Sequence, residues 1–190
     1  YEANFNSYET IEDANGIAGN SVSGKRSAYI LEERVADSKK FHFNTNYNTS
    51  LTDNIQLTAG LSFLKQNTDN FKRVGDLLGG EFYVDVNQYA EQDFAGNENA
   101  LQNDLNNPNR IVYEGDKFGY NYTSEIARAA GWAQGQMKLD RIDIFAALEL
   151  SNNSFKRIGN VRNGLFPDNS YGESETQSFF NYSAKGGATY

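Results

Sequence analysis

The stretch DRIDIFAALELS, residues 140–151, constrains the fold most, because its polarity alternates with a period of two. One set of alternate positions is apolar and comprises Ile142, Ile144, Ala146, Leu148 and Leu150. The positions between them are mixed and comprise Asp143, Phe145, Ala147, Glu149 and Ser151. This period belongs to a β-strand with one apolar face. The alternation alone leaves open whether that face meets a protein core or lipid.

Five further segments alternate in the same way, at 28–36, 41–51, 55–63, 126–139 and 180–190, the first of them weakly. Each is long enough to be a β-strand, and together with the first stretch they predict about six strands. For the first 25 residues the sequence predicts only a loop, ANGIAGNSVSG at 14–24.

The connections between these strands are of two kinds. Turns at 53–54 and 140–141 are short, and each predicts an antiparallel hairpin. Residues 64–119 and 152–177 hold no long alternating run and are predicted to be long loops. Compact soluble domains rarely contain structureless connections beyond ~12–15 residues, whereas outer-membrane barrels have short periplasmic turns and long extracellular loops. We therefore predict an all-β fold of antiparallel up-and-down strands that form part of a transmembrane β-barrel.

The placement of aromatic residues agrees with a barrel. They fall mainly at the predicted outer ends of the strands, where a barrel carries an aromatic girdle. The residues predicted to face lipid are Phe41, Phe43, Ile55, Leu57, Leu61, Phe63, Ile142, Ile144, Leu148, Leu150, Phe180 and Tyr182. The opposite positions are rich in amides, which a protein core does not accept but a watered or plugged lumen does. On periodicity alone, an antiparallel sandwich with one solvated face is the alternative.

Composition argues against several other classes of protein. No apolar run approaches the ~18–20 residues of a transmembrane helix. A formal net charge of −8 argues against a nucleic-acid partner. The chain has no cysteine, so it has neither a disulfide framework nor a thiolate metal site. Its single histidine, His42, lies among asparagines on a predicted strand, and we expect a lumen-facing side chain there rather than a catalytic base. An enzyme is not predicted.

The long loops carry aromatic rings and guanidinium groups that could line a vestibule for a ligand. These residues are Phe82, Tyr83, Tyr89, Arg110, Phe118, Tyr120, Arg162 and Phe166. Stacking faces with guanidinium donors would suit a glycan, a peptide or an anionic chelate. The alternative is that these side chains pack the loops against each other as a rigid cap, with YVDVNQY forming a short strand.

Carboxylates are numerous in the first long loop. Asp76, Asp85 and Asp93, with Glu81 and Glu91 near them, offer oxygen ligands of the kind that Ca²⁺ prefers. Their spacing does not reproduce an EF-hand loop, so a solvated acidic loop is the alternative to a calcium site. No other cofactor is predicted.

Four strings of the loops resemble the barrel region of large TonB-dependent outer-membrane receptors: DLLGGEFYVDVNQYAEQDF, NDLNNPNR, GDKFGYNY and GNVRNGLFPDNSYG. The receptors in question carry a carboxypeptidase-regulatory-like domain ahead of the plug, and the resemblance covers about residues 29–190. It implies a roughly 22-stranded barrel with an N-terminal plug. It also implies energised uptake of a bulky nutrient or chelate, an inner-membrane energising complex, and a location in the bacterial outer membrane with the loops outside.

The chain departs from the complete receptor pattern. It has no recognisable plug domain, and six strands cannot close a barrel without leaving exposed edges in lipid. We therefore expect residues 1–190 to be a fragment whose partners are outer-membrane lipid, the rest of the barrel with its plug, and a surface lipoprotein. Two alternatives are a receptor-like barrel that acts as a scaffold of a surface complex, and a soluble β-sandwich that binds glycans.

Overall fold

The computed structural model describes residues 8–11, 23–94 and 96–190. Strands make up 67% of the structure, beside two short helices, so the predicted all-β class is confirmed. The strands are β1 (Tyr8–Ile11), β2 (Gly24–Ser27), β3 (Leu31–Thr52), β4 (Ile55–Asp76), β5 (Tyr83–Val84), β6 (Ile111–Val112), β7 (Lys117–Leu139), β8 (Ile142–Gly159), β9 (Gly172–Glu173) and β10 (Gln177–Thr189). The helices are α1 (Gln88–Asp93) and α2 (Glu98–Leu101).

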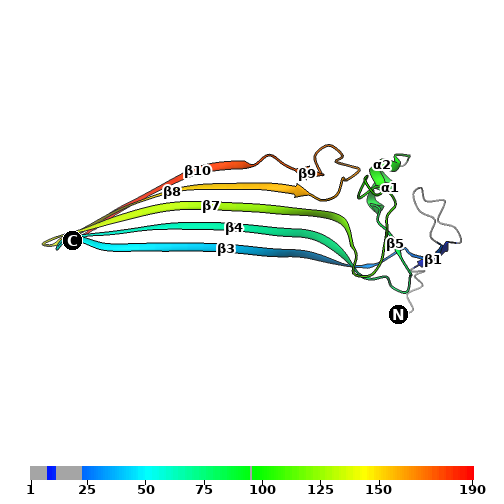
Figure 1. Ribbon diagram of the computed structural model, residues 1–190, viewed down its shortest axis with the longest axis horizontal. Helices are drawn as coiled ribbons and strands as arrows, with labels where there is room; N and C mark the ends of the chain where they lie inside the picture. Colours follow the sequence, from blue (N-terminus) through cyan, green and yellow to red (C-terminus); the bar gives the residue numbers. More distant parts are fainter. Residues whose placement is uncertain (1–7, 12–22, 95) are drawn as a thin grey trace. The chain divides into compact units, whose positions relative to one another are not determined.

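The five long strands lie side by side in one sheet, in the order β10-β8-β7-β4-β3 (Figure 1). β10 pairs antiparallel with β8 in a register that sets Tyr182 opposite Leu150 and Ala184 opposite Leu148. β9 pairs with the end of β8, while β1 with β2 and β5 with β6 form separate two-stranded sheets. Among the described strands, β3 and β10 are the edges of the large sheet, which is not closed into a barrel.

The two predicted hairpin turns are confirmed at 53–54, between β3 and β4, and at 140–141, between β7 and β8. The observed long strands extend beyond most of the predicted segments. The segments at 28–36 and 41–51 belong largely to a single strand, β3, and the connections without long strands shrink to 77–116 and 160–176. The loop predicted at 14–24 lies mostly outside the described residues, and its last residue begins β2.

The parts of β4 and β7 that lie outside the predicted segments have no apolar alternation, because polar side chains pair across the strands there. Lys72 on β4 donates to Glu32 on β3 at 2.7 Å, and Arg73 pairs with Glu33 beside it. Thr123 Oγ1 on β7 donates to Asp69 on β4 at 2.6 Å. Side-chain pairs of this kind stabilise a sheet whose two faces are both polar.

The chain divides into two compact units. The loop unit comprises the described parts of Tyr1–Asp37, Thr68–Ser124 and Arg157–Ser174, and the sheet unit comprises Ser38–Asn67, Glu125–Lys156 and Glu175–Tyr190.

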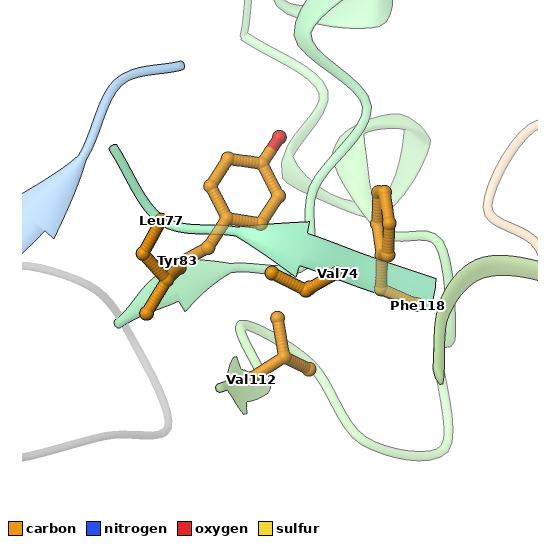
Figure 2. Packing of buried hydrophobic residues seen from close by; sticks show 5 residues of the cluster. All are labelled: Val74, Leu77, Tyr83, Val112 and Phe118. Carbon is orange, nitrogen blue, oxygen red and sulfur yellow. The ribbon is translucent and has the colours of Figure 1, made fainter. Parts of the chain in front are cut away.

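The loop unit contains a hydrophobic core. Val74, Leu77, Tyr83, Val112 and Phe118 pack together there (Figure 2), and Ile30 lies against them. The pairing of β5 with β6 places Tyr83 opposite Val112, so the predicted short strand in YVDVNQY is confirmed. This core gives the first long loop a defined structure.

The sheet unit has no such core. Its one buried apolar side chain among the described residues is that of Ala130, at 8% exposure. No helix among the described residues is long and apolar enough to span a membrane.

Candidate functional site

A cavity of about 500 Å³ lies in the loop unit and contains four of the eight residues predicted to contact a ligand. Those four are Tyr83, Tyr89, Phe118 and Tyr120. The rest of its lining comprises Ala28, Tyr29, Ile30, Glu32, Arg34, Lys72, Val86, Asn87, Gln88, Asn103, Gly119 and Asn163. We call this cavity the loop pocket.

Aromatic rings of the loop pocket differ in exposure. Tyr83 and Phe118 are each 6% exposed and meet edge to face, with ring centroids 5.8 Å apart. Tyr89 is 83% exposed and Tyr120 is 38% exposed, so parts of both rings are free to stack on a ligand. The Asn87 side chain caps α1 by accepting from the Tyr89 and Ala90 amides, which fixes the start of the helix that carries Tyr89.

The charged groups of the pocket leave one positive charge in excess. Glu32 accepts hydrogen bonds from Lys72 at 2.7 Å and from Arg34 at 2.8 Å, so two cations share one carboxylate. The hydrogen bond from Lys72 lowers the pKa of Glu32, and the bond from Arg34 lowers it further against the opposing effect of burial. The Lys72 ammonium also lies 5.6 Å from the centroid of the Phe118 ring and 5.9 Å from that of Tyr120.

Amide side chains from both long loops complete the lining of the loop pocket. Gln88 donates to the Ala28 carbonyl at 3.1 Å, and Asn103 donates to Asp85 at 2.8 Å. Asn87 and Asn163 also line the cavity. Rings, amides and a surplus cation together provide stacking, hydrogen bonding and one ion pair, which suits a glycan or a peptide that carries a carboxylate.

The other four predicted ligand residues do not line the loop pocket. Phe82 is 1% exposed and belongs to the interior of the loop unit. The Arg110 guanidinium donates to Asp85 at 2.7 Å and to the Lys117 carbonyl at 2.6 Å. Arg162 donates to the Pro167 carbonyl at 3.0 Å. Phe166 is 61% exposed but is not part of the cavity wall. For Phe82 the alternative of loop packing is therefore the correct one.

The predicted calcium ligands do not come together. Asp85 is buried and accepts from Arg110, Asn103 and the Gly119 amide, so its oxygens already have donors. Asp76 accepts from the Leu78 amide, and Asp93 ends α1. In the part of the chain that the structure describes, no three His, Cys, Asp or Glu side chains could hold a metal ion. Glu81 accepts from the Lys25 amide at 3.2 Å, and the Glu91 side chain lies outside the described residues.

No pattern in the sequence points to the charged part of the loop pocket. Glu32 and Lys72 are separated by 40 residues, and Asn163 comes from the second long loop. Only the antiparallel pairing of β3 with β4 brings Glu32 and Lys72 together.

The ionisation of the Tyr83 phenol tests whether the Tyr83 ring is buried in the loop unit. Burial, and next the nearby Asp85 carboxylate, raise the pKa of the Tyr83 phenol above its ordinary value of 10.0. The unfolded chain therefore loses this proton first, and the loop unit is expected to lose stability as the pH rises above 10. The absorbance of phenolate, measured as the difference between the wild type and Tyr83→Phe, should rise only above pH 10. In denaturant the same difference should titrate at the ordinary value, and identical curves in both states would contradict the prediction.

The residues predicted to face lipid form one apolar face of the sheet unit. Contacts between strands confirm the shared face: Phe41 and Phe63 have ring centroids 6.3 Å apart, and Tyr182 lies opposite Leu150. The large side chains that are at least 36% exposed include Phe41, Phe43, Leu61, Phe63, Ile142, Ile144, Leu148, Leu150, Phe180 and Tyr182. Ile55 and Leu57 are of intermediate exposure. Nothing within the sheet unit covers this face.

The opposite face of the sheet unit is more polar and carries a few large rings. Arg128 pairs with Glu149 there, and Trp132, Gln134 and Lys185 line a shallow hollow. Gly60 makes room for the Trp132 indole, because a Cβ at Gly60 would lie 2.6 Å from the indole nitrogen. The Trp132 indole therefore lies on the polar face, among Gln134 and Lys185.

The sequence matches no protein-family model and no curated protein at a significant level. The assignment of a function therefore depends on the loop pocket and on the apolar face of the sheet unit.

Proposed function

We propose that the chain forms part of the wall of a TonB-dependent outer-membrane receptor and that its loop unit captures a ligand outside the cell. The sheet unit would lie in the bilayer with its apolar face toward lipid and its polar face toward a lumen that holds a plug. Passage through the lumen would depend on the rest of the barrel and the plug, and on a separate inner-membrane energising complex.

The observation that carries this proposal is the exposed apolar face of a sheet unit that has no core of its own. Phe41, Leu61 and Phe180 are each more than 60% exposed, and in water such a continuous patch would be strongly unfavourable. A hydrocarbon environment removes that cost. The polar opposite face, with the Arg128–Glu149 pair, suits a hydrated lumen rather than a protein core.

The loop pocket supports the receptor part of the proposal. It is held by a hydrophobic core and by cross-strand ion pairs, so its rings and amides are largely positioned before a ligand arrives. A pre-formed cavity with a few polar groups among aromatic rings is the usual form of a small-ligand site.

Site-directed labelling tests which face meets lipid. Leu148→Cys and Glu149→Cys place a thiol on opposite faces of β8 in a stretch with no natural cysteine. In native membranes, with modification read at that residue by mass spectrometry, the cysteine at 148 should react with a membrane-confined maleimide. The cysteine at 149 should react with a charged, water-soluble maleimide.

Two results would contradict the proposal. Equal reaction of both cysteines with the charged reagent would mean that the apolar face of β8 is not in lipid. Recovery of the protein as a soluble, cooperatively unfolding monomer without detergent would favour the soluble glycan-binding sandwich instead.

A further inference from the structure

A group of lysines at one end of the apolar face defines a second candidate site. Lys39 and Lys40 of β3 and Lys65 of β4 line a hollow of about 330 Å³ together with Phe41, Phe63 and Asn67. We call Lys39, Lys40 and Lys65 the lysine rim. Lys39 is two residues from Phe41 and Lys65 is two residues from Phe63, so both lysines share the face of the aromatic pair.

The charge of the lysine rim is not neutralised within the sheet unit. Among the described residues, none of its three lysines forms an ion pair. Glu125 of β7, which lines a neighbouring hollow with Lys65, already has partners of its own: it pairs with Lys156 at 3.4 Å and accepts from Asn67 at 3.5 Å. The sheet unit has eight Lys or Arg and six Asp or Glu, whereas the whole chain carries −8. The sheet unit therefore carries a net positive charge although the whole chain is negative, because it holds few of the carboxylates.

An apolar groove adjoins the lysine rim. It has a volume of about 500 Å³ and shares Phe63 with the cationic hollow. The small residues Ala129 and Gly131 of β7 lie among larger neighbours that line the same groove: Phe43, Leu61, Leu150 and Phe180. Gly131 leaves space beside Leu61, since a Cβ there would lie 3.3 Å from a Leu61 methyl carbon.

We propose that the lysine rim and this groove bind one membrane lipid that carries a phosphate headgroup. The ammonium groups would hold the phosphate, and an acyl chain would lie in the groove over Ala129 and Gly131. Lysine ammonium groups bind phosphate as point charges, and a lysine stem can lie along apolar surface while its charge stays at the polar interface. A free phosphate ion would use the lysines but gain nothing from the groove, so the two features together favour a lipid.

This proposal rests on the proposed function, because it requires the apolar face to lie in a bilayer. The test uses the complete natural protein in mild detergent and measures bound lipid by native mass spectrometry. The two lipids compared are dioleoyl phosphatidic acid and dioleoylglycerol, which differ only in the phosphate. Removing two lysine charges, in the double variant Lys39→Gln with Lys65→Gln, should weaken binding of phosphatidic acid at least about tenfold. Binding of dioleoylglycerol should not change.

Two matched variants separate the parts of the site. Lys185→Gln removes a lysine from the opposite face and should leave binding of phosphatidic acid unchanged. Ala129→Leu fills the groove and should weaken both lipids.

Wild-type affinity in the lysine double variant would overturn the proposal, as would an equal loss in Lys185→Gln. Displacement of phosphatidic acid by inorganic phosphate, with no effect of Ala129→Leu, would show a free-phosphate site instead. Failure of the receptor proposal itself is recognised separately, by water-phase labelling of the cysteine at 148.

Discussion

Replacing Asp85 with asparagine is expected to cost the loop unit about 2–4 kcal/mol of local stability. The Asp85 side chain is 1% exposed, and all three of its partners are donors: the Arg110 guanidinium at 2.7 Å, the Asn103 amide at 2.8 Å and the Gly119 backbone amide at 2.8 Å. Asparagine would place an NH₂ group against one of these donors and leave Arg110 without its counter-charge. The loss stays below that of a fully buried pair because the Arg110 side chain is 36% exposed and keeps part of its hydration.

Hydrogen exchange of the Gly119 amide measures this effect, since that amide donates directly to Asp85. In Asp85→Asn its exchange should be at least about 30-fold faster, the equivalent of 2 kcal/mol. The control is Asp93→Asn, the same chemical change at an exposed position, which should alter local stability by less than about 0.5 kcal/mol. Wild-type protection of Gly119 in Asp85→Asn would show that the buried carboxylate does not hold the first long loop.

Replacing Gly164 with alanine is expected to separate the two long loops. A Cβ at Gly164 would lie 1.8 Å from the Asn99 carbonyl oxygen and 3.0 Å from that of Gln102. Both obstacles are backbone atoms, so no side chain can turn aside, and the loops must move apart at a cost of about 1–3 kcal/mol. The move would break the hydrogen bond from the Gly164 amide to the Gln102 carbonyl, which is 2.8 Å long.

Bonds around Asp104 report this separation. Asp104 accepts from the Arg162 amide at 3.1 Å, and the Leu105 amide donates to the Arg162 carbonyl at 2.7 Å. Faster exchange of the Leu105 amide in Gly164→Ala is the expected result. Gly135→Ala is the control, because a Cβ at Gly135 would have no atom within 4 Å. Equal exchange at Leu105 in both variants would mean that Gly164 does not lock the loops together.

The loop pocket was predictable only in part. The rings of Tyr83, Tyr89, Phe118 and Tyr120 are candidates in the sequence because they offer stacking faces in long loops, and all four line the cavity. Tyr83 and Phe118 also belong to the hydrophobic core, as the alternative of loop packing predicts. Arg110 is a candidate because its guanidinium could donate to a ligand, but it donates to the buried Asp85 instead. A sequence shows that a loop arginine is present and does not show which carboxylate it meets.

The strand lengths show a related limit. Alternation predicted the strands where one face is apolar, and it ended where both faces become polar. Beyond that point β3 and β4 continue through the pairing of Glu32 with Lys72. Charged residues at such positions have no period of two in hydrophobicity, so the extension is visible only once the partner strand is in place.

By itself, the sequence determined the all-β class, the hairpin turns and which side chains of each strand share the apolar face. These are local properties, because a period of two and a two-residue turn involve only neighbouring residues. The tertiary structure alone decided which loop residues line a pocket, which acidic residue is buried with Arg110, and that Lys39 and Lys65 lie beside one aromatic pair. Those features join residues far apart in the chain, and their formation depends on the pairing of strands rather than on the character of any single segment.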